Sequence, residues 1–459
     1  MNEYLLIFGA AAAIALAWAW RVSDGSTRVV LVVFLGVYVL TTGIGAFLIG
    51  VRGVSVLDDL GYGLETRILT DLDGPLYWGM LLAPLIVTPV ILLWPSRGRV
   101  TNRAAGALTG GFRDDVDLLS FWAVMLLFGG YCVVRFIQTG TMGAIGDFLD
   151  LRGDYESILV LRGQVLGQLG TFDCALVYAL LPALAQCAMF QAARRKTWGW
   201  RLTFAAAFGL TALLSIAVMQ KALILIFGVF LAVGLLELKV IRLRTLAVVA
   251  LAAVIVLAGM EAAYVGEWSL GGTMDLLIFR MASSYPYYMN LYPRDIPYAG
   301  IQFNLDMLGL APPIRDNLDV FDRMYPQTAA FIQGAAAAPA HVRAYAQAGV
   351  EYALLTLVVI AAILKLTAAV RRRFRGPLTF ALYMQMLVLL YYLSQVSLRD
   401  SLLSSYGFLW SLVGLGAIVA ARALGRLASR AAGALGKVRP PLTHHVPQSC
   451  QSCTDGSEK

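Results

Sequence analysis

The chain has 459 residues, of which 59% are apolar and only 14% are charged, and its formal net charge is +8. Soluble domains carry roughly 25% charged residues, so this composition excludes a soluble globular enzyme, a disordered chain and a secreted disulfide scaffold. Several uninterrupted apolar runs reach the length of about 18 residues that a helix needs to cross a bilayer, whereas the strands of a membrane β-barrel would be short and alternating. The sequence therefore predicts an all-α, polytopic membrane protein.

Apolar runs bounded by charged residues, glycine or proline predict about eleven transmembrane helices. The stretch 202–238 is too long for one span of about 20 residues. It is broken only at Gln220 and Lys221, which predicts a tight helical hairpin. The helices form a predicted membrane domain over residues 1–423, with spans near 4–20, 28–49, 77–95, 118–137, 169–191, 202–219, 222–238, 245–262, 347–369, 378–397 and 402–423.

The basic residues orient these helices. Most of the 36 Lys and Arg residues fall in alternate connections, around 21–28, 97–113, 194–201, 239–244 and 371–375, and in the tail. Such connections stay in the cytoplasm, which predicts that the N-terminus is outside and the C-terminus is cytoplasmic. The same placement explains the positive charge without a nucleic-acid partner. The tail, 424–459, is predicted to be amphipathic and then disordered.

Three sizeable segments fall on the opposite, external side: 50–76, 138–168 and 263–346. Only the last is long enough for a structured element, and its prolines predict short interrupted helices. The cytoplasmic connections are too short to hold a catalytic domain. Any chemistry is therefore expected at the external face or within the membrane.

Some external basic residues are not explained by the orientation rule. A charge near hydrocarbon costs a few kcal/mol and often marks a functional cavity, although snorkelling to the interface is an alternative. Guanidinium forks suit phosphate groups, so several of them at a membrane boundary suit a lipid diphosphate. The candidate diphosphate ligands are Arg280, Lys221, Arg343 and Arg399, with Arg135 as a weaker one.

Aromatic residues accompany these cations. Tyr285, Tyr288 and Tyr298 follow Arg280, and Tyr345 lies shortly before the ninth predicted span. Their rings could stack on sugars. An aromatic belt at the bilayer surface is the alternative interpretation.

Two residues are candidates for a general base. His341 is the only histidine outside the tail, and Glu156 belongs to an acidic stretch in segment 138–168. An external histidine titrates near neutral pH, but a lone loop histidine is often incidental. No cofactor or metal is expected, because the sequence contains no nucleotide-binding or zinc-protease motif and the single Cys-x-x-Cys pair lies in the polar tail.

Together these features resemble the Wzy-type oligosaccharide repeat-unit polymerases, which assemble O-antigens and exopolysaccharides. The similarity lies in the basic residue at the hairpin turn (SIAVMQKALILIF) and in a large external loop that opens with Arg280 and a tyrosine- and proline-rich run (RMASSYPYYMNLYPRDIPYAG). The loop closes on PAHVRAYAQAG before the next helix. The resemblance covers roughly residues 120–400. Lys221 departs from it, since many members have Arg there.

The resemblance implies an inverting, metal-independent glycosyltransferase in the bacterial inner membrane. It would transfer a growing glycan from undecaprenyl diphosphate to a new lipid-linked repeat unit at the outer face. Fixed arginines would stabilise the departing diphosphate, and His341 or Glu156 would act as the base. The implied partners are the lipid-linked oligosaccharide and membrane lipids, with flippase and chain-length regulator proteins.

Three other functions remain open from the sequence. An O-antigen ligase would use the same donor with a different acceptor. A polyprenyl-monophosphate sugar transferase would rely on Asp71 and Asp73 in the first external segment. A flippase or transporter for the lipid-linked glycan would place more charge within the spans.

Overall fold

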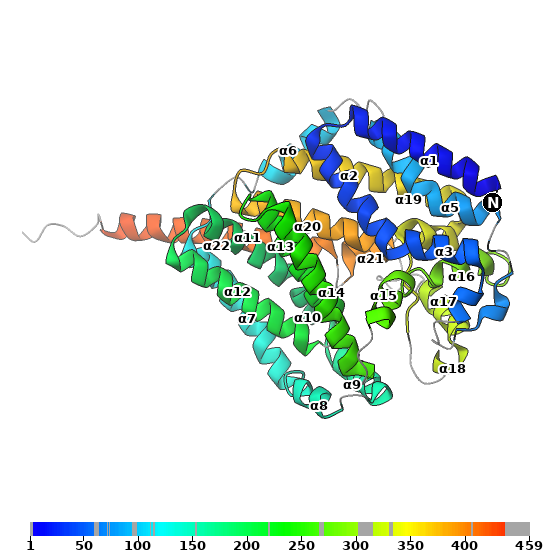
Figure 1. Ribbon diagram of the computed structural model, residues 1–459. Coiled ribbons are helices and arrows are strands. Elements are labelled where there is room, and N and C mark those ends of the chain that lie inside the picture. Colours follow the sequence, from blue (N-terminus) through cyan, green and yellow to red (C-terminus); the bar gives the residue numbers. More distant parts are fainter. Residues whose placement is uncertain are drawn as a thin grey trace, which may run out of the picture.

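Helices are the only regular secondary structure in the part of the chain that the computed structural model describes, where no strand occurs (Figure 1). This part comprises residues 3–58, 64–70, 72, 74–93, 99–110, 112, 115–151, 154–218, 221–265, 270–301, 315–329, 334–404 and 407–436. The predicted all-α class is confirmed.

The helices follow the order of the predicted spans. The first half of the chain forms α1 (Glu3–Val22), α2 (Gly25–Tyr38), the π-helical segment η1 (Val39–Gly43), α3 (Ile44–Arg52), α4 (Ser55–Asp58), α5 (Pro75–Leu93), α6 (Arg99–Gly110), α7 (Leu118–Gln138), α8 (Ala144–Asp150), α9 (Tyr155–Gln168), α10 (Thr171–Ala175), the π-helical segment η3 (Leu176–Leu180) and α11 (Leu181–Arg195). The second half forms α12 (Trp198–Ala217), α13 (Lys221–Glu237), α14 (Leu243–Val265), α15 (Leu270–Phe279), α16 (Ser284–Leu291), α17 (Asp316–Met324), α18 (Pro326–Ala329), α19 (Ala340–Arg371), α20 (Pro377–Leu393), α21 (Leu398–Leu403) and α22 (Phe408–Gly436).

Eight helical segments in the described chain are long and apolar enough to cross a membrane, which supports a multi-pass membrane protein. Three shorter apolar helices, Leu223–Glu237, Leu243–Val256 and Pro377–Leu393, coincide with three further predicted spans. The total of eleven spans stays a prediction. The predicted hairpin is present, since α12 ends at Ala217, α13 begins at Lys221 and the two helices contact each other.

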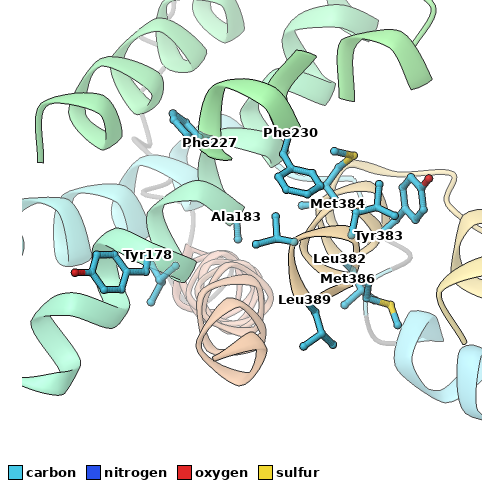
Figure 2. Packing of buried hydrophobic residues seen from close by; sticks show 14 of the residues in the cluster. Tyr178, Ala183, Phe227, Phe230, Leu382, Tyr383, Met384, Met386 and Leu389 are labelled. Atoms are coloured by element: carbon cyan, nitrogen blue, oxygen red, sulfur yellow. The ribbon is translucent and has the colours of Figure 1, made fainter. Parts of the chain in front are cut away.

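The core of the bundle is centred on α20. Its residues from Pro377 to Leu393 are all buried except Tyr391, as expected for a helix that is apolar on every side. It contacts α11, α13, α19 and α22. Figure 2 shows Leu382 and Met384 of α20 among Phe230 of α13 and Ala183 of α11.

One end of the bundle, which we call the basic end, gathers the connections that the sequence predicts on one side. Arg371 pairs with Glu237 at 2.9 Å, so the end of α19 meets the end of α13. The other links join Arg372 to Asp24 at 2.9 Å, Arg373 to the carbonyl of Asn102 at 2.6 Å, and Arg195 to Asp115. These contacts place the described residues of the connections 22–25, 99–110, 115–117, 195–197, 237–243 and 371–376 on a common face.

The opposite end, which we call the tyrosine end, contains α16, α17, α18 and residues 64–70 (Figure 1). The two chain segments bond to each other directly: the amide of Glu65 donates to the carbonyl of Met324 at 2.9 Å, and the amide of Thr70 donates to Asn290 Oδ1 at 3.0 Å. The described part of segment 263–346 therefore forms short helices that pack onto the ends of the long ones.

Two helices differ from the predicted boundaries. Helix α19 is interrupted at Ala348 and Gly349, where Gly349 has φ +84°, so a helical piece that begins at Ala340 precedes the piece that matches the predicted span near 347–369. Glycine tolerates this backbone conformation better than other residues. Helix α22 continues to Gly436 without a break at the predicted domain boundary after 423, and its last turns extend away from the bundle (Figure 1).

Candidate functional site

Four of the predicted diphosphate ligands, Lys221, Arg343, Arg135 and Arg399, lie at the opposite end of the bundle from the basic end. Helices α13 and α19 both finish at the basic end, so Lys221 and Arg343, near their starts, lie at the other end. Helix α7 starts just after Asp115 at the basic end and carries Arg135 in its last turn. Arg399 follows α20, which starts at the basic end.

A buried ion cluster is the most distinctive feature of this end, and Arg343 is its centre. Its Nε donates to Asp316 Oδ2 at 2.8 Å and its Nη2 donates to Oδ1 of the same carboxylate at 2.5 Å. Its Nη1 donates to Asp400 Oδ2 at 2.7 Å. One guanidinium thus joins α17, α19 and α21, and we call these three residues the Arg343 clamp.

The clamp is nearly closed to solvent on one side and open on the other. The side chains of Arg343 and Asp316 are 7% and 0% exposed, whereas that of Asp400 is 30% exposed. A buried charge is tolerated when its partners satisfy its hydrogen bonds, and the bidentate fork to Asp316 does so. Two carboxylates against one guanidinium leave the clamp with a formal charge of −1, and Asp400 carries the accessible carboxylate.

Two further predicted ligands, Arg280 and Arg399, take no part in the ion pairs of the clamp. Arg280, just after α15, has an exposed side chain that forms no ion pair with any described residue. It interacts electrostatically with Tyr391 near the end of α20. Arg399 is half-buried and precedes Asp400 directly in α21, where it has interactions of its own.

The remaining predicted ligands have other environments. Arg135 Nε pairs with Asp173 Oδ2 at 3.3 Å, and the hydroxyl of Tyr131 donates to Asp173 Oδ1 at 3.1 Å. Asp173 in α10 therefore neutralises the charge of Arg135 in α7. The side chains of Lys221 and of the predicted base Glu156 lie outside the described residues, although α13 begins at Lys221 and Glu156 lies in α9.

The predicted glycan-binding tyrosines are mostly core residues. Tyr285, Tyr288 and Tyr345 are at most 2% exposed, and each hydroxyl donates to a backbone carbonyl, at 2.5, 3.1 and 2.8 Å respectively. Burial raises the pKa of the Tyr288 phenol well above its ordinary value, and the Asp316 carboxylate raises it further, so the phenol stays a neutral donor. These three rings offer no face for a sugar. Tyr298, with 40% exposure, is the accessible member of the set.

The position of His341 does not suit a base acting on a glycan hydroxyl. The side chain is buried, with 2% exposure, and Nε2 lies 3.2 Å from the carbonyl oxygen of Met80 in α5. A carbonyl only accepts, so Nε2 is the donor and carries the proton. The edge of the ring packs against Tyr38 of α2, with the centroids 5.8 Å apart. His341 thus fastens α19 to α5 and α2.

Sequence reasoning missed both acidic members of the clamp. Asp316 and Asp400 are far apart along the chain, and each lies in the first turn of a short helix, where acidic residues are common for local reasons. The available signal was electrostatic. An arginine expected near hydrocarbon needs carboxylates, and both acids lie on the same predicted side as Arg343.

The described residues contain no group of three or more His, Cys, Asp or Glu that could hold a metal ion. Asp71 and Asp73, the acidic pair of the sugar-transferase alternative, lie outside the described residues. Comparison of the chain with protein-family models, with curated proteins and with solved structures finds no match.

Proposed function

We propose that this protein is a glycosyltransferase that joins oligosaccharide repeat units carried on polyprenyl diphosphate, in the manner of a polysaccharide polymerase. The observation that carries the proposal is the Arg343 clamp, together with Arg399 on the same helix as Asp400 and the exposed Arg280 after α15. Arg280 and Arg399 supply positive charge near the ends of membrane helices, where the head group of a lipid-linked substrate would bind, whereas the clamp itself has a formal charge of −1. The clamp also includes the partly exposed carboxylate of Asp400.

The chemistry requires stabilisation of a leaving group. When the anomeric carbon–oxygen bond breaks, negative charge grows on the lipid diphosphate, and prearranged donors stabilise such charge without reorganisation. Arg280 is suited to bind it, because the side chain is exposed and is not neutralised by a described acidic residue. Arg343 has the different role of holding α21, and with it Arg399, at a fixed position.

The proposed location follows from the positive-inside rule. The basic end faces the cytoplasm, and the tyrosine end faces the outside of the inner membrane. The lipid-linked repeat unit would then be used after it has been translocated, and no nucleotide sugar would be needed at the site.

The test uses the purified protein in detergent with synthetic polyprenyl-diphosphate repeat units. We expect a ladder of glycan polymers, resolved by gel electrophoresis and mass spectrometry. Because no sealed bilayer is present, polymer formation would exclude a pure flippase or transporter. Transfer of single units to a lipid A-core acceptor, with no ladder, would instead indicate a ligase.

Arg280→Ala should reduce polymer formation at least about a hundredfold, comparable to the loss of one oxyanion donor. Arg280→Lys should recover only a small part, since an ammonium lacks the planar fork. Arg67→Ala is the matched control: Arg67 is another exposed arginine of the tyrosine end, and it should retain full activity. A normal ladder from Arg280→Ala would contradict the assignment of Arg280.

A further inference from the structure

Asp400 combines a fixed position with an accessible oxygen. Its Oδ2 accepts the bond from Arg343, whereas Oδ1 has no hydrogen-bond partner among the described residues. The side chain is 30% exposed, in contrast to the fully buried Asp316. The carboxylate therefore has one oxygen bound by Arg343 and another that no described residue binds, on a side chain that is partly open to solvent.

The backbone of α21 holds this carboxylate in place. Ser397 caps the helix by accepting from the Asp400 amide at 3.1 Å, and its carbonyl accepts from the Ser401 hydroxyl at 2.9 Å. The carbonyl of Asp400 accepts from the Ser404 hydroxyl at 2.6 Å. On the other side, Arg343 is itself fixed by the bidentate bond to Asp316. A group held from both sides loses little entropy when it acts on a substrate.

Resting on the proposed function, we infer that Asp400 is the general base of the glycosyl transfer. Its carboxylate accepts the proton of the acceptor sugar hydroxyl while that oxygen forms the new bond to the anomeric carbon. The bond from the anomeric carbon to the diphosphate oxygen breaks, and its electron pair leaves with the polyprenyl diphosphate. Asp400 then releases the proton to water. Arg343 is a positioning residue in this scheme.

The geometry favours Asp400 over His341, one of the two candidate bases from the sequence. His341 is enclosed by α2 and α5, and its Nε2 donates to the Met80 carbonyl. Asp400 is the partly exposed carboxylate of the clamp. It also directly follows Arg399, so that a proton acceptor and a cation are adjacent on one short helix.

The decisive variant is Asp400→Asn, measured by the detergent polymerisation assay together with binding of polyprenyl diphosphate. The amide oxygen can still accept from Arg343, but it cannot take up a proton, so the clamp is retained. We expect kcat to fall by about 10²–10⁴-fold, the usual contribution of a general base. Diphosphate binding and KM for the donor should stay within about twofold of the wild type. Asp400→Glu should restore part of kcat.

Two controls separate catalysis from structure. Asp319→Asn alters another partly exposed carboxylate of the tyrosine end, which pairs with Arg315, and should retain wild-type turnover. Asp316→Asn loosens the clamp from its buried side, so it should lower the melting temperature more than Asp400→Asn does while reducing kcat less.

Wild-type turnover by Asp400→Asn, while the wild-type protein polymerises, would overturn the base assignment and leave the proposed function intact. Parallel loss of kcat and of diphosphate binding would also overturn it, since a base is not needed to bind the donor. Equal kcat losses in Asp316→Asn and Asp400→Asn would also overturn the base assignment, because they would indicate that Asp400 acts only by holding the clamp together. Absence of polymer from the wild-type protein would instead refute the proposed function itself.

Discussion

At the scale of single residues, Arg343 shows how burial changes what a charge can do. In the sequence it is one of several arginines that could bind a diphosphate. In the structure its donors already serve Asp316 and Asp400, and only 7% of the side chain is exposed. A saturated, buried guanidinium organises its neighbours and leaves ligand binding to exposed residues such as Arg280. The same reasoning applies to His341 and to Tyr285, which are polar groups satisfied inside the bundle.

Replacing Arg343 should therefore destabilise the protein severely. Arg343→Met leaves two carboxylates without their cation, and breaking a buried pair from one side costs about 3–5 kcal/mol. The double variant Arg343→Met with Asp316→Leu should lose less than the single one, because the uncompensated buried charge is gone. Thermal unfolding in detergent measures both. A double variant less stable than Arg343→Met would contradict this account of the clamp.

At the scale of elements, polar contacts and close backbone approach decide how apolar helices assemble. Gln385 of α20 donates to Gln186 of α11 at 2.8 Å, and Ser411 of α22 donates to Gln385 at 2.9 Å. The hydroxyl of Ser411 also lies 3.3 Å from the carbonyl oxygen of Ala179 in the π-helical segment η3. In a membrane, such bonds and small residues set which helices meet, because apolar burial alone does not discriminate between partners.

Gly45, in α3, provides an element-scale test. A Cβ at this position would collide with the carbonyl oxygen of Ile278 in α15 and with the side chain of Ala282. Gly45→Ala should therefore push α15 away from α3, lowering the melting temperature and the activity together. Gly209→Ala in α12 is the control, since a Cβ there has open space around it. It should be neutral, or stabilising by up to about 1 kcal/mol. If the two variants melt alike, the close contact of α3 and α15 is not important for stability.

At the scale of the whole molecule, the two ends differ in kind. Ion pairs between distant connections hold the basic end together, whereas the tyrosine end is a small folded layer of short helices with its own buried cluster. The sequence assigns these two sets of connections to opposite faces. The contacts join the basic connections to one another, and on the other side they join residues 64–70 to α16 and α17, whereas α8 and α9 of segment 138–168 contact α12 and α14 instead. Which face is cytoplasmic stays a prediction from the positive-inside rule.

Cysteine labelling tests that orientation. In a variant without its native cysteines, Arg67→Cys at the tyrosine end should react with a membrane-impermeant maleimide in intact cells. Arg244→Cys at the start of α14, an exposed residue beside the basic end, should react only after the membrane is permeabilised. The reverse labelling pattern would invert the topology and place the Arg343 clamp in the cytoplasm.

The sequence by itself determined the helical membrane class, most helix positions and the grouping of the connections. These features depend on local quantities: the length of an apolar run, the charge that bounds it and the alternation of basic loops. The hairpin around Lys221 was predictable for the same reason, since a run of 37 residues cannot be one span.

Only the tertiary structure decided which polar groups meet. Asp316, Arg343 and Asp400 lie on three different helices. Nothing local in the sequence distinguishes the carboxylates of Asp316 and Asp400 from those that cap helices. Likewise, the sequence of a tyrosine-rich segment does not show whether its rings face a substrate or are buried in the core. Burial and pairing depend on how distant segments fold onto one another, and it is this packing that turns Arg343 from a candidate ligand into the centre of a clamp.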